Sequence, residues 1–160
     1  MQSKKIVIAI AAMCIGYAWG EYAGKKKELR KKSNAQKYLS IYKPWMEKMQ
    51  KGESIADFVI NKQYENVAVY GLGKLGVSLI NELKDKGIPI AYIIDQRADE
   101  IFYEDIDVYS FSERLPDVGA IIITTVNDQK ELREKIMCRL KCDVYTLEEL
   151  VMHDRGTDNV

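Results

Sequence analysis

The sequence predicts an α/β fold: a Rossmann-like, doubly wound sheet of five parallel strands in the order 3-2-1-4-5, preceded by N-terminal helices. Residues 66–95 show a strand, a glycine loop, a helix and a second strand in that order. The run GAIIITTV at 119–126 is apolar enough for a parallel strand buried on both faces. A helical pattern at 127–140 separates it from the strand pattern DVYT at 143–146. Strands that alternate with helices are typical of parallel sheets.

The length and composition fit one globular domain with an appendage. The chain has 160 residues, of which 47% are hydrophobic and 30% are charged. Its 24 basic residues match its 24 acidic residues, so the charge gives no reason to expect a nucleic-acid partner. The three cysteines, Cys14, Cys138 and Cys142, are too few for a disulfide framework, and we interpret them as thiols in a reducing compartment.

An uncharged segment, residues 6–20, lies near the start of the chain. Two lysines precede it and six basic residues follow within 24–32. We predict a membrane-anchor helix over 1–24, which places the domain on the cytoplasmic side of the inner membrane because the heavier basic flank follows the helix. Fifteen residues is short for a bilayer, so a cleaved signal peptide and a helix of a soluble cytoplasmic protein stay open.

Small residues recur at four-residue spacing within this segment. They are Ala12, Gly16, Gly20 and Gly24. Small residues at this spacing allow two membrane helices to approach closely, so the pattern predicts self-association.

Residues 25–63 are predicted to form a basic juxtamembrane segment followed by connecting helices. Pro44 interrupts the helical pattern and is expected to kink or restart the helix, and Gly52 is expected to end it. A short helix should then begin after Ser54, because Asp57 three residues later completes a variant of the capping box.

An apolar stripe at three- and four-residue spacing runs along these helices. We interpret it as a face packed against the domain, with a surface for a partner protein as the alternative. The stripe comprises Tyr38, Ile41, Tyr42, Trp45, Met46 and Met49.

The loop GLGKLG carries the pattern G-x-G-x-x-G after the first strand. Gly71 permits a tight turn, Gly73 lets the backbone approach a pyrophosphate, and Gly76 lets helix and strand pack closely. The helix that follows offers unpaired N–H groups to phosphate, and Lys74 adds a positive charge. Leu72 and Leu75 complete the loop. The pattern predicts a dinucleotide site, although the glycines also fit tight packing without a ligand.

The second strand ends at Asp95, 19 residues after Gly76. A carboxylate at this position accepts hydrogen bonds from the ribose hydroxyls of an adenosine. Gln96 follows directly, and Arg97 is placed to stack on the adenine or to meet a 2′-phosphate. Because of Asp95, NAD is preferred over NADP. Arg97 is the feature that would favour NADP.

Two threonines, Thr124 and Thr125, end the fourth strand. In the predicted order this strand lies beside the first, where open α/β sheets bind ligands, so both threonines are candidate cofactor-binding residues. The Rossmann-like domain is predicted over 64–152, including a capped last helix that begins near Thr146. A polar tail occupies 153–160.

Catalytic and metal-binding patterns are missing from the sequence. The one histidine, His153, lies in the tail, and Cys138 and Cys142, four apart on a predicted helix, would need further metal ligands. Tyr70 and Lys74 match the Tyr-x-x-x-Lys pair of short-chain reductases but span the phosphate loop, so we interpret the match as coincidence. The P-loop spacing is absent too. No catalytic residue is predicted, and the question of an enzymatic activity stays open.

Three stretches, VAVYGLGKLGVSLINELKDKGIPIAYIIDQ, DVYSFSERLPDVGAIIITTV and DVYTLEELV, resemble the Rossmann-like domain of bacterial surface-polysaccharide biosynthesis proteins. There the domain precedes nucleotide-sugar dehydratase or sugar acyltransferase domains, or forms small stand-alone members. The resemblance covers residues 64–151. It implies that Gly71, Gly73 and Gly76 bind NAD(P) or the diphosphate of a nucleotide sugar, with Asp95 as the ribose acid. The fused members carry a catalytic domain that does not follow here.

The leading hypothesis is a membrane-tethered Rossmann domain that faces the cytoplasm and binds NAD(P) or a nucleotide sugar. It would be an accessory or regulatory protein of surface-polysaccharide synthesis. A second hypothesis is a small oxidoreductase or epimerase that a partner chain or dimerisation completes. A third is an interaction scaffold with an empty glycine loop. A homo-oligomer and a polysaccharide-biosynthesis enzyme are the expected protein partners.

Overall fold

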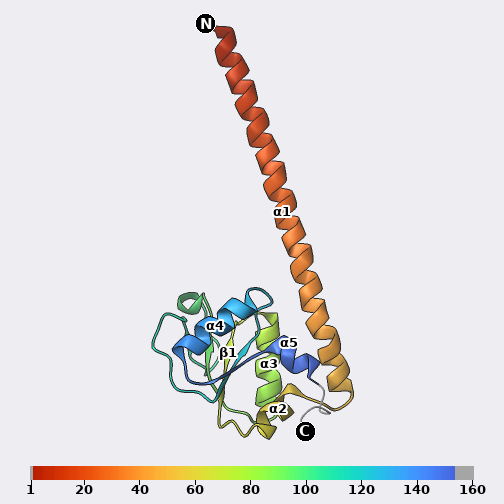
Figure 1. The fold of residues 1–160 in the computed structure, drawn as a ribbon, viewed down its shortest axis with the longest axis vertical. Helices are drawn as coiled ribbons and strands as arrows, with labels where there is room; N and C mark the ends of the chain where they lie inside the picture. The colour runs from red at the N-terminus through yellow and green to blue at the C-terminus, as the bar shows by residue number, and fades with distance from the viewer. Residues whose placement is uncertain (1, 154–160) are drawn as a thin grey trace. The chain divides into compact units, whose positions relative to one another are not determined.

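The structure, a computed structural model, describes the backbone of residues 2–153 and the side chains from Trp19 to His153. The chain divides into two compact units, Met1–Lys37 and Tyr38–Val160. The second unit holds a five-stranded parallel sheet with helices on both faces (Figure 1). Its strand order is β3-β2-β1-β4-β5, so the predicted fold class and strand order are confirmed.

Helices separate most of the strands along the second unit, but no helix lies between the third strand and the fourth. The strands are β1 (Val67–Tyr70), β2 (Ile90–Ile94), β3 (Val108–Tyr109), β4 (Ala120–Ile123) and β5 (Asp143–Thr146). The helices are α1 (Gln2–Gln50), α2 (Ile55–Asn61), α3 (Lys74–Asp85), the 3-10 turn η1 (Ala98–Glu100), α4 (Gln129–Arg139) and α5 (Leu147–Met152). Strand β1 pairs in parallel with both β2 and β4, so the strand order reverses beside β1.

Two hydrophobic layers cover the sheet. Val67 and Val69 of β1 face α2, α3, α5 and the last turns of α1, whereas Ala68 and Tyr70 face α4. This alternation is the two-residue period of a strand, and both sets are apolar because helices cover both faces. Each fully buried isoleucine or leucine stabilises such a core by about 1.5–3 kcal/mol. The layers hold β1 and β4 in place at the point where the strand order reverses.

Helix α1 is continuous from Gln2 to Gln50. The prediction that the helix restarts at Pro44 is therefore wrong. A proline removes one backbone hydrogen bond from a helix interior. Ile41 and Trp45, on either side of Pro44, are almost fully buried in the core of the second unit. This packing offsets the lost bond, since tertiary contacts commonly override local propensity.

Local signals set the other helix ends as predicted. Gly52 ends α1 with a backbone φ of +74°, a left-handed conformation that glycine adopts without strain. Capping boxes begin α2 at Ser54 and α5 at Thr146. Helix α4 ends at Arg139, so Cys142 lies beyond it, which corrects the prediction that this cysteine shares a helix with Cys138.

The compact second unit begins at Tyr38, whereas the sequence placed the start of the domain at Tyr64. The difference arises because the last turns of α1 and the whole of α2 contribute to the core. Of the predicted apolar stripe, Ile41 and Trp45 are buried, while Met46 and Met49 are exposed. The stripe therefore divides into a packed face and an exposed face.

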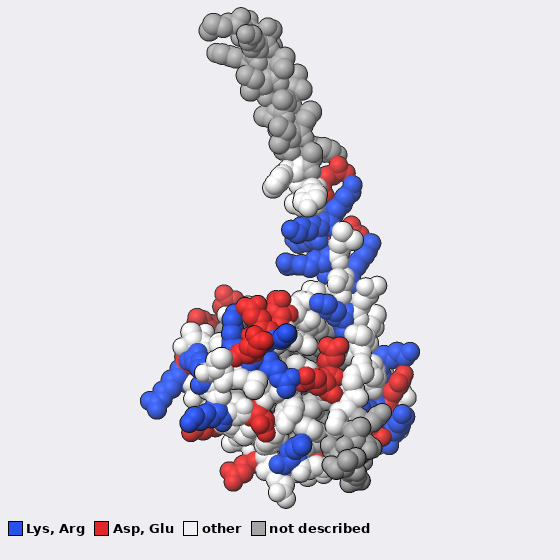
Figure 2. Space-filling view, viewed as in Figure 1, with Lys and Arg blue, Asp and Glu red and all other residues white. Residues whose placement is uncertain are grey.

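In the first unit, Lys and Arg side chains gather along α1 in the predicted basic segment, 24–32 (Figure 2). None of the helices, within the described part of the chain, is long and apolar enough to cross a membrane. The side chains of residues 1–18, which include most of the predicted anchor, lie outside the described residues, as does the polar tail from 154 to 160. The anchor stays a prediction.

Candidate functional site

The glycine loop joins the end of β1 to the start of α3, at the edge where the strand order reverses. Gly71 has a φ of +100°, and a Cβ atom there would lie 3.0 Å from both Thr124 Oγ1 and Thr125 Cγ2. A Cβ atom on Gly76 would lie 2.0 Å from the carbonyl oxygen of Gly71. The fold itself therefore requires glycine at these two positions, whether or not a ligand binds.

Gly73 differs from the other two glycines. It is exposed, its backbone has a φ of −91° and a ψ of −171°, and the atom nearest to a Cβ built there is the Tyr38 hydroxyl oxygen at 3.9 Å. Neither backbone strain nor packing explains glycine at this position. Without a side chain, the backbone at Gly73 is open to the approach of a ligand.

Helix α3 begins at this exposed part of the loop. Gly73 is its N-cap and supplies no side chain, so the N–H groups of the first turn lie at an open helix end. Lys74, the first residue of the helix, is exposed, and no ion pair involves it in the described part of the chain. Leu72 and Leu75 are buried in the core beneath. The outer side of the loop thus combines a helix N-terminus with a free ammonium group.

Asp95 lies directly after β2, against the inner side of the loop. It is 8% exposed; Oδ2 accepts a 2.7 Å hydrogen bond from the N–H of Leu72, and Oδ1 accepts one of 3.0 Å from the N–H of Arg97. Burial by itself would raise the pKa of Asp95, but these hydrogen bonds and the charge of Arg97 outweigh it and lower the pKa. An ionised carboxylate has about four acceptor positions, so Asp95 can still accept a hydrogen bond from a ligand hydroxyl.

Arg97 contacts this carboxylate from the solvent side. The Arg97 Nε lies 3.4 Å from Asp95 Oδ1, and 59% of the side chain is exposed, so the contact is weak. Gln96 is also exposed. The predicted role of Arg97 at an adenine or a 2′-phosphate stays a prediction.

The two threonines that end β4 lie beside the loop but differ in role. Thr124 is buried, and its hydroxyl is within hydrogen-bonding distance of the carbonyl oxygens of Gly71, at 2.7 Å, and Tyr70, at 3.0 Å. Because its one proton serves these carbonyls, Thr124 braces the loop from below. Thr125 is half-buried, and its carbonyl accepts a 2.7 Å hydrogen bond from Gln129 Nε2. Thr125 lies closer to the solvent side of the edge.

Sequence reasoning missed Tyr38 beside the loop and a buried acid, Glu82, farther along α3. Tyr38, on α1, places its hydroxyl next to Gly73, and in the described part of the chain that hydroxyl has no hydrogen-bond partner. Only its membership of the apolar stripe was visible in the sequence. Glu82, on α3, is buried and accepts hydrogen bonds from Trp45 Nε1 at 2.6 Å and from the N–H of Ile55 at 2.5 Å. A glutamate one turn before the end of an amphipathic helix gives no such signal.

Comparisons of the chain with protein-family models, curated proteins and solved structures found no match. The resemblance to domains of polysaccharide-biosynthesis proteins therefore stays a prediction. Among the described residues no group of side chains is arranged to hold a metal ion. The geometry of the glycine loop is the basis for the function proposed below.

Proposed function

We propose that the chain binds a nucleotide that carries a diphosphate, either NAD(P) or a nucleotide sugar, on the outer side of the glycine loop. The proposal rests on Gly73, the one glycine of the pattern that neither strain nor packing within the described structure requires. Glycine is suitable as an N-cap but is not required there, and its lack of a side chain lets another molecule lie against the backbone.

The chemistry around Gly73 suits a diphosphate. The open N-terminus of α3 offers N–H donors and a partial positive charge, and Lys74 adds a full charge at the same end. The Tyr38 hydroxyl lies on the other side of Gly73 and can donate to a phosphate oxygen. Donors from two helices would therefore surround the phosphates.

The ribose would lie at Asp95, whose remaining acceptor position can receive a hydroxyl proton. A charged carboxylate repels a 2′-phosphate, which favours NAD over NADP, whereas the exposed Arg97 beside it is the residue that would accept NADP. A nucleoside diphosphate sugar offers the same diphosphate and ribose to these groups.

The biological setting that we propose is an accessory or regulatory role in surface-polysaccharide synthesis, with the chain held at the cytoplasmic face of the membrane. Two features of the sequence support this setting: the resemblance over residues 64–151, and the basic segment after an apolar run. The same nucleotide site would serve this role whether the chain acts alone or with an enzyme.

Isothermal titration calorimetry tests the site directly. The full chain is titrated with NAD, NADP and a panel of UDP- and GDP-sugars, alongside a Gly73→Val variant. We expect one ligand class to bind, and the valine to weaken it about 100-fold or more because its side chain occupies the phosphate position. The variant should remain folded, with a cost of about 1 kcal/mol from the poorer N-cap.

Two results would contradict the proposal. One is the absence of binding at millimolar concentration for every nucleotide in the panel. The other is binding that Gly73→Val leaves unchanged, which would place the ligand elsewhere on the chain.

A further inference from the structure

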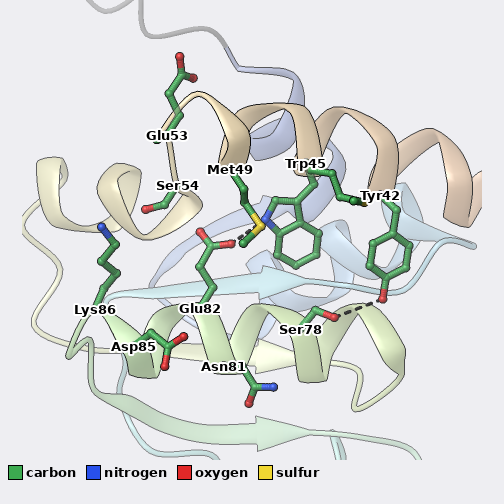
Figure 3. A pocket seen from close by; sticks show the side chains of 12 residues that line it. Tyr42, Trp45, Met49, Glu53, Ser54, Ser78, Asn81, Glu82, Asp85 and Lys86 are labelled. Atoms are coloured by element: carbon green, nitrogen blue, oxygen red, sulfur yellow. Dashed lines mark hydrogen bonds between the residues drawn. The ribbon is translucent and has the colours of Figure 1, made fainter.

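A groove lies between the last turns of α1 and helix α3 (Figure 3). Its volume is about 530 Å³. Both walls belong to the second unit, and the groove is separate from the outer side of the glycine loop. From α1 it is lined by Tyr42, Trp45, Met46 and Met49, and from α3 by Ser78, Asn81, Glu82 and Asp85.

Fixed contacts hold this groove open. Trp45 Nε1 donates to Glu82 Oε2 at 2.6 Å, and the hydroxyls of Tyr42 and Ser78 lie 3.3 Å apart (Figure 3). Tyr42 and Trp45 also stack, with ring centroids 6.0 Å apart. The two helices therefore run side by side in the same direction, and the groove exists before any partner binds.

A ridge of exposed apolar side chains borders the groove on α1. Leu39 is 66% exposed, Met46 57% and Met49 56%. With Tyr42 they recur at steps of three, four and three residues, which is the spacing of a seam that packs against another helix. Large apolar side chains gathered along a preformed groove mark an interaction surface.

This face carries both halves of a self-complementary contact. An interface with two-fold symmetry uses one patch on both copies, so the patch must present a ridge and a groove together. Here the ridge of Leu39, Met46 and Met49 also forms part of one wall of the groove, because Met46 and Met49 line it together with Tyr42. A partner with only a ridge or only a groove would leave half of this surface unused.

The charges along α3 favour the same partner. Lys74 is the first residue of α3 and Asp85 the last, and the spacing of 74, 78, 81 and 85 places them on one face of the helix. Both are exposed, and neither has an ion pair in the described part of the chain. The neighbouring charged residues do form ion pairs: Lys86 pairs with Asp57, and Glu53 pairs with Lys48.

We propose that this face binds the same face of a second copy of the chain, with a two-fold axis near the middle of the ridge. Lys74 and Asp85 lie at about equal distances on either side of that axis, so Lys74 of each copy faces Asp85 of the other. The ridge of each copy fills the groove of its partner. This contact shares Lys74 with the proposed nucleotide site and is otherwise made by different residues.

The mass of the purified full chain, measured by light scattering over a concentration series, tests the contact. We expect a dimer, and we expect Met46→Asp to raise its dissociation constant about 10-fold or more by burying a charge in the seam. Met137→Asp is the matched control, because Met137 is 60% exposed on α4, away from the groove. It should leave the mass unchanged.

Charge reversal tests the two-fold arrangement. Lys74→Asp and Asp85→Lys should each weaken the dimer, and the double variant should restore it, because opposite charges face each other again. A monomeric wild-type chain, a dimer that survives Met46→Asp, or a double variant no stronger than the single ones would overturn the proposal. Loss of the dimer in Met137→Asp as well would also overturn it.

Discussion

At the edge of the sheet where the strands begin, the polar groups bond to one another. The Tyr64 hydroxyl donates to Asp143 Oδ2 and lies 2.8 Å from the Tyr145 hydroxyl, and the N–H of Gly119 donates to Asn66 Oδ1 at 3.3 Å. At the opposite edge, where the strands end, the inner side of the glycine loop is satisfied in the same way, by Asp95 and Thr124. Its outer side is left open.

The difference between the edges separates stability from binding. Groups at the amino edge already have partners within the chain, so they stabilise the fold and have little left for a ligand. The Lys74 ammonium and the Tyr38 hydroxyl at the carboxyl edge lack such partners in the described structure. Substitutions at the amino edge should therefore lower stability and leave nucleotide affinity unchanged. Substitutions on the outer side of the loop should lower affinity and leave stability almost unchanged.

The largest effect is expected within the loop itself. Gly76→Ala should lower the free energy of unfolding by about 3 kcal/mol or more, because its Cβ atom would lie 2.0 Å from a backbone oxygen. Gly73→Ala should cost about 1 kcal/mol at most, the difference between a good and a poor N-cap residue. Urea denaturation of the two variants measures this. Equal losses would show that the outer side is as tightly packed as the inner side.

Asp95→Asn should change the acid dependence of stability. Burial raises the pKa of Asp95, but the hydrogen bonds from Arg97 and Leu72 outweigh it, so the pKa in the folded state is below the ordinary 3.8. A carboxyl group with a lowered pKa stabilises the fold above its unfolded pKa, and this contribution is lost as pH falls.

We therefore expect wild-type stability to fall as pH drops below about 4. Asp95→Asn should be less stable at pH 7 by about 1–3 kcal/mol and should lack this part of the decline. Denaturation curves from pH 7 to pH 2 measure both effects. Parallel curves for the two proteins would mean that Asp95 does not hold the loop.

Tyr38→Phe should weaken nucleotide binding about 10-fold, because it removes one hydrogen bond to a charged phosphate, and should leave stability almost unchanged. Tyr42→Phe is the matched control: it lies on the same helix, but its hydroxyl meets Ser78 instead of the loop. Calorimetric titration of both variants makes the comparison. Equal affinities in both would exclude the Tyr38 hydroxyl from the site.

Tyr64→Phe should have the smallest effect, and it should change stability instead of nucleotide affinity. Burial and the hydrogen bonds with Asp143 and Tyr145 raise the pKa of Tyr64, which shows that the neutral hydroxyl is the favoured form in the fold. Loss of this hydroxyl should cost about 1 kcal/mol of stability and leave nucleotide affinity unchanged. Thermal unfolding together with titration checks this, and a loss of affinity would contradict the separation of the two edges.

Much of the fold follows from local patterns. The alternation of strands and helices predicted the sheet and its order, and Ser54 and Thr146 predicted the starts of α2 and α5, because capping depends on residues only three apart. The glycine spacing predicted the loop. The course of α1 through Pro44 was not predictable, since the burial of Ile41 and Trp45 that offsets the proline depends on the distant helix α3.

The sequence by itself determined the sheet, the glycine loop and the acid after the second strand, because each depends on neighbours along the chain or on a two- or four-residue period. Only the tertiary structure decided what each part does there. Packing showed that Gly71 and Gly76 serve the fold while Gly73 does not, and that Asp95 holds the loop. It also placed Tyr38 beside that loop and left one face of α1 exposed, because contacts between distant segments depend on three-dimensional packing, which residue spacing does not record.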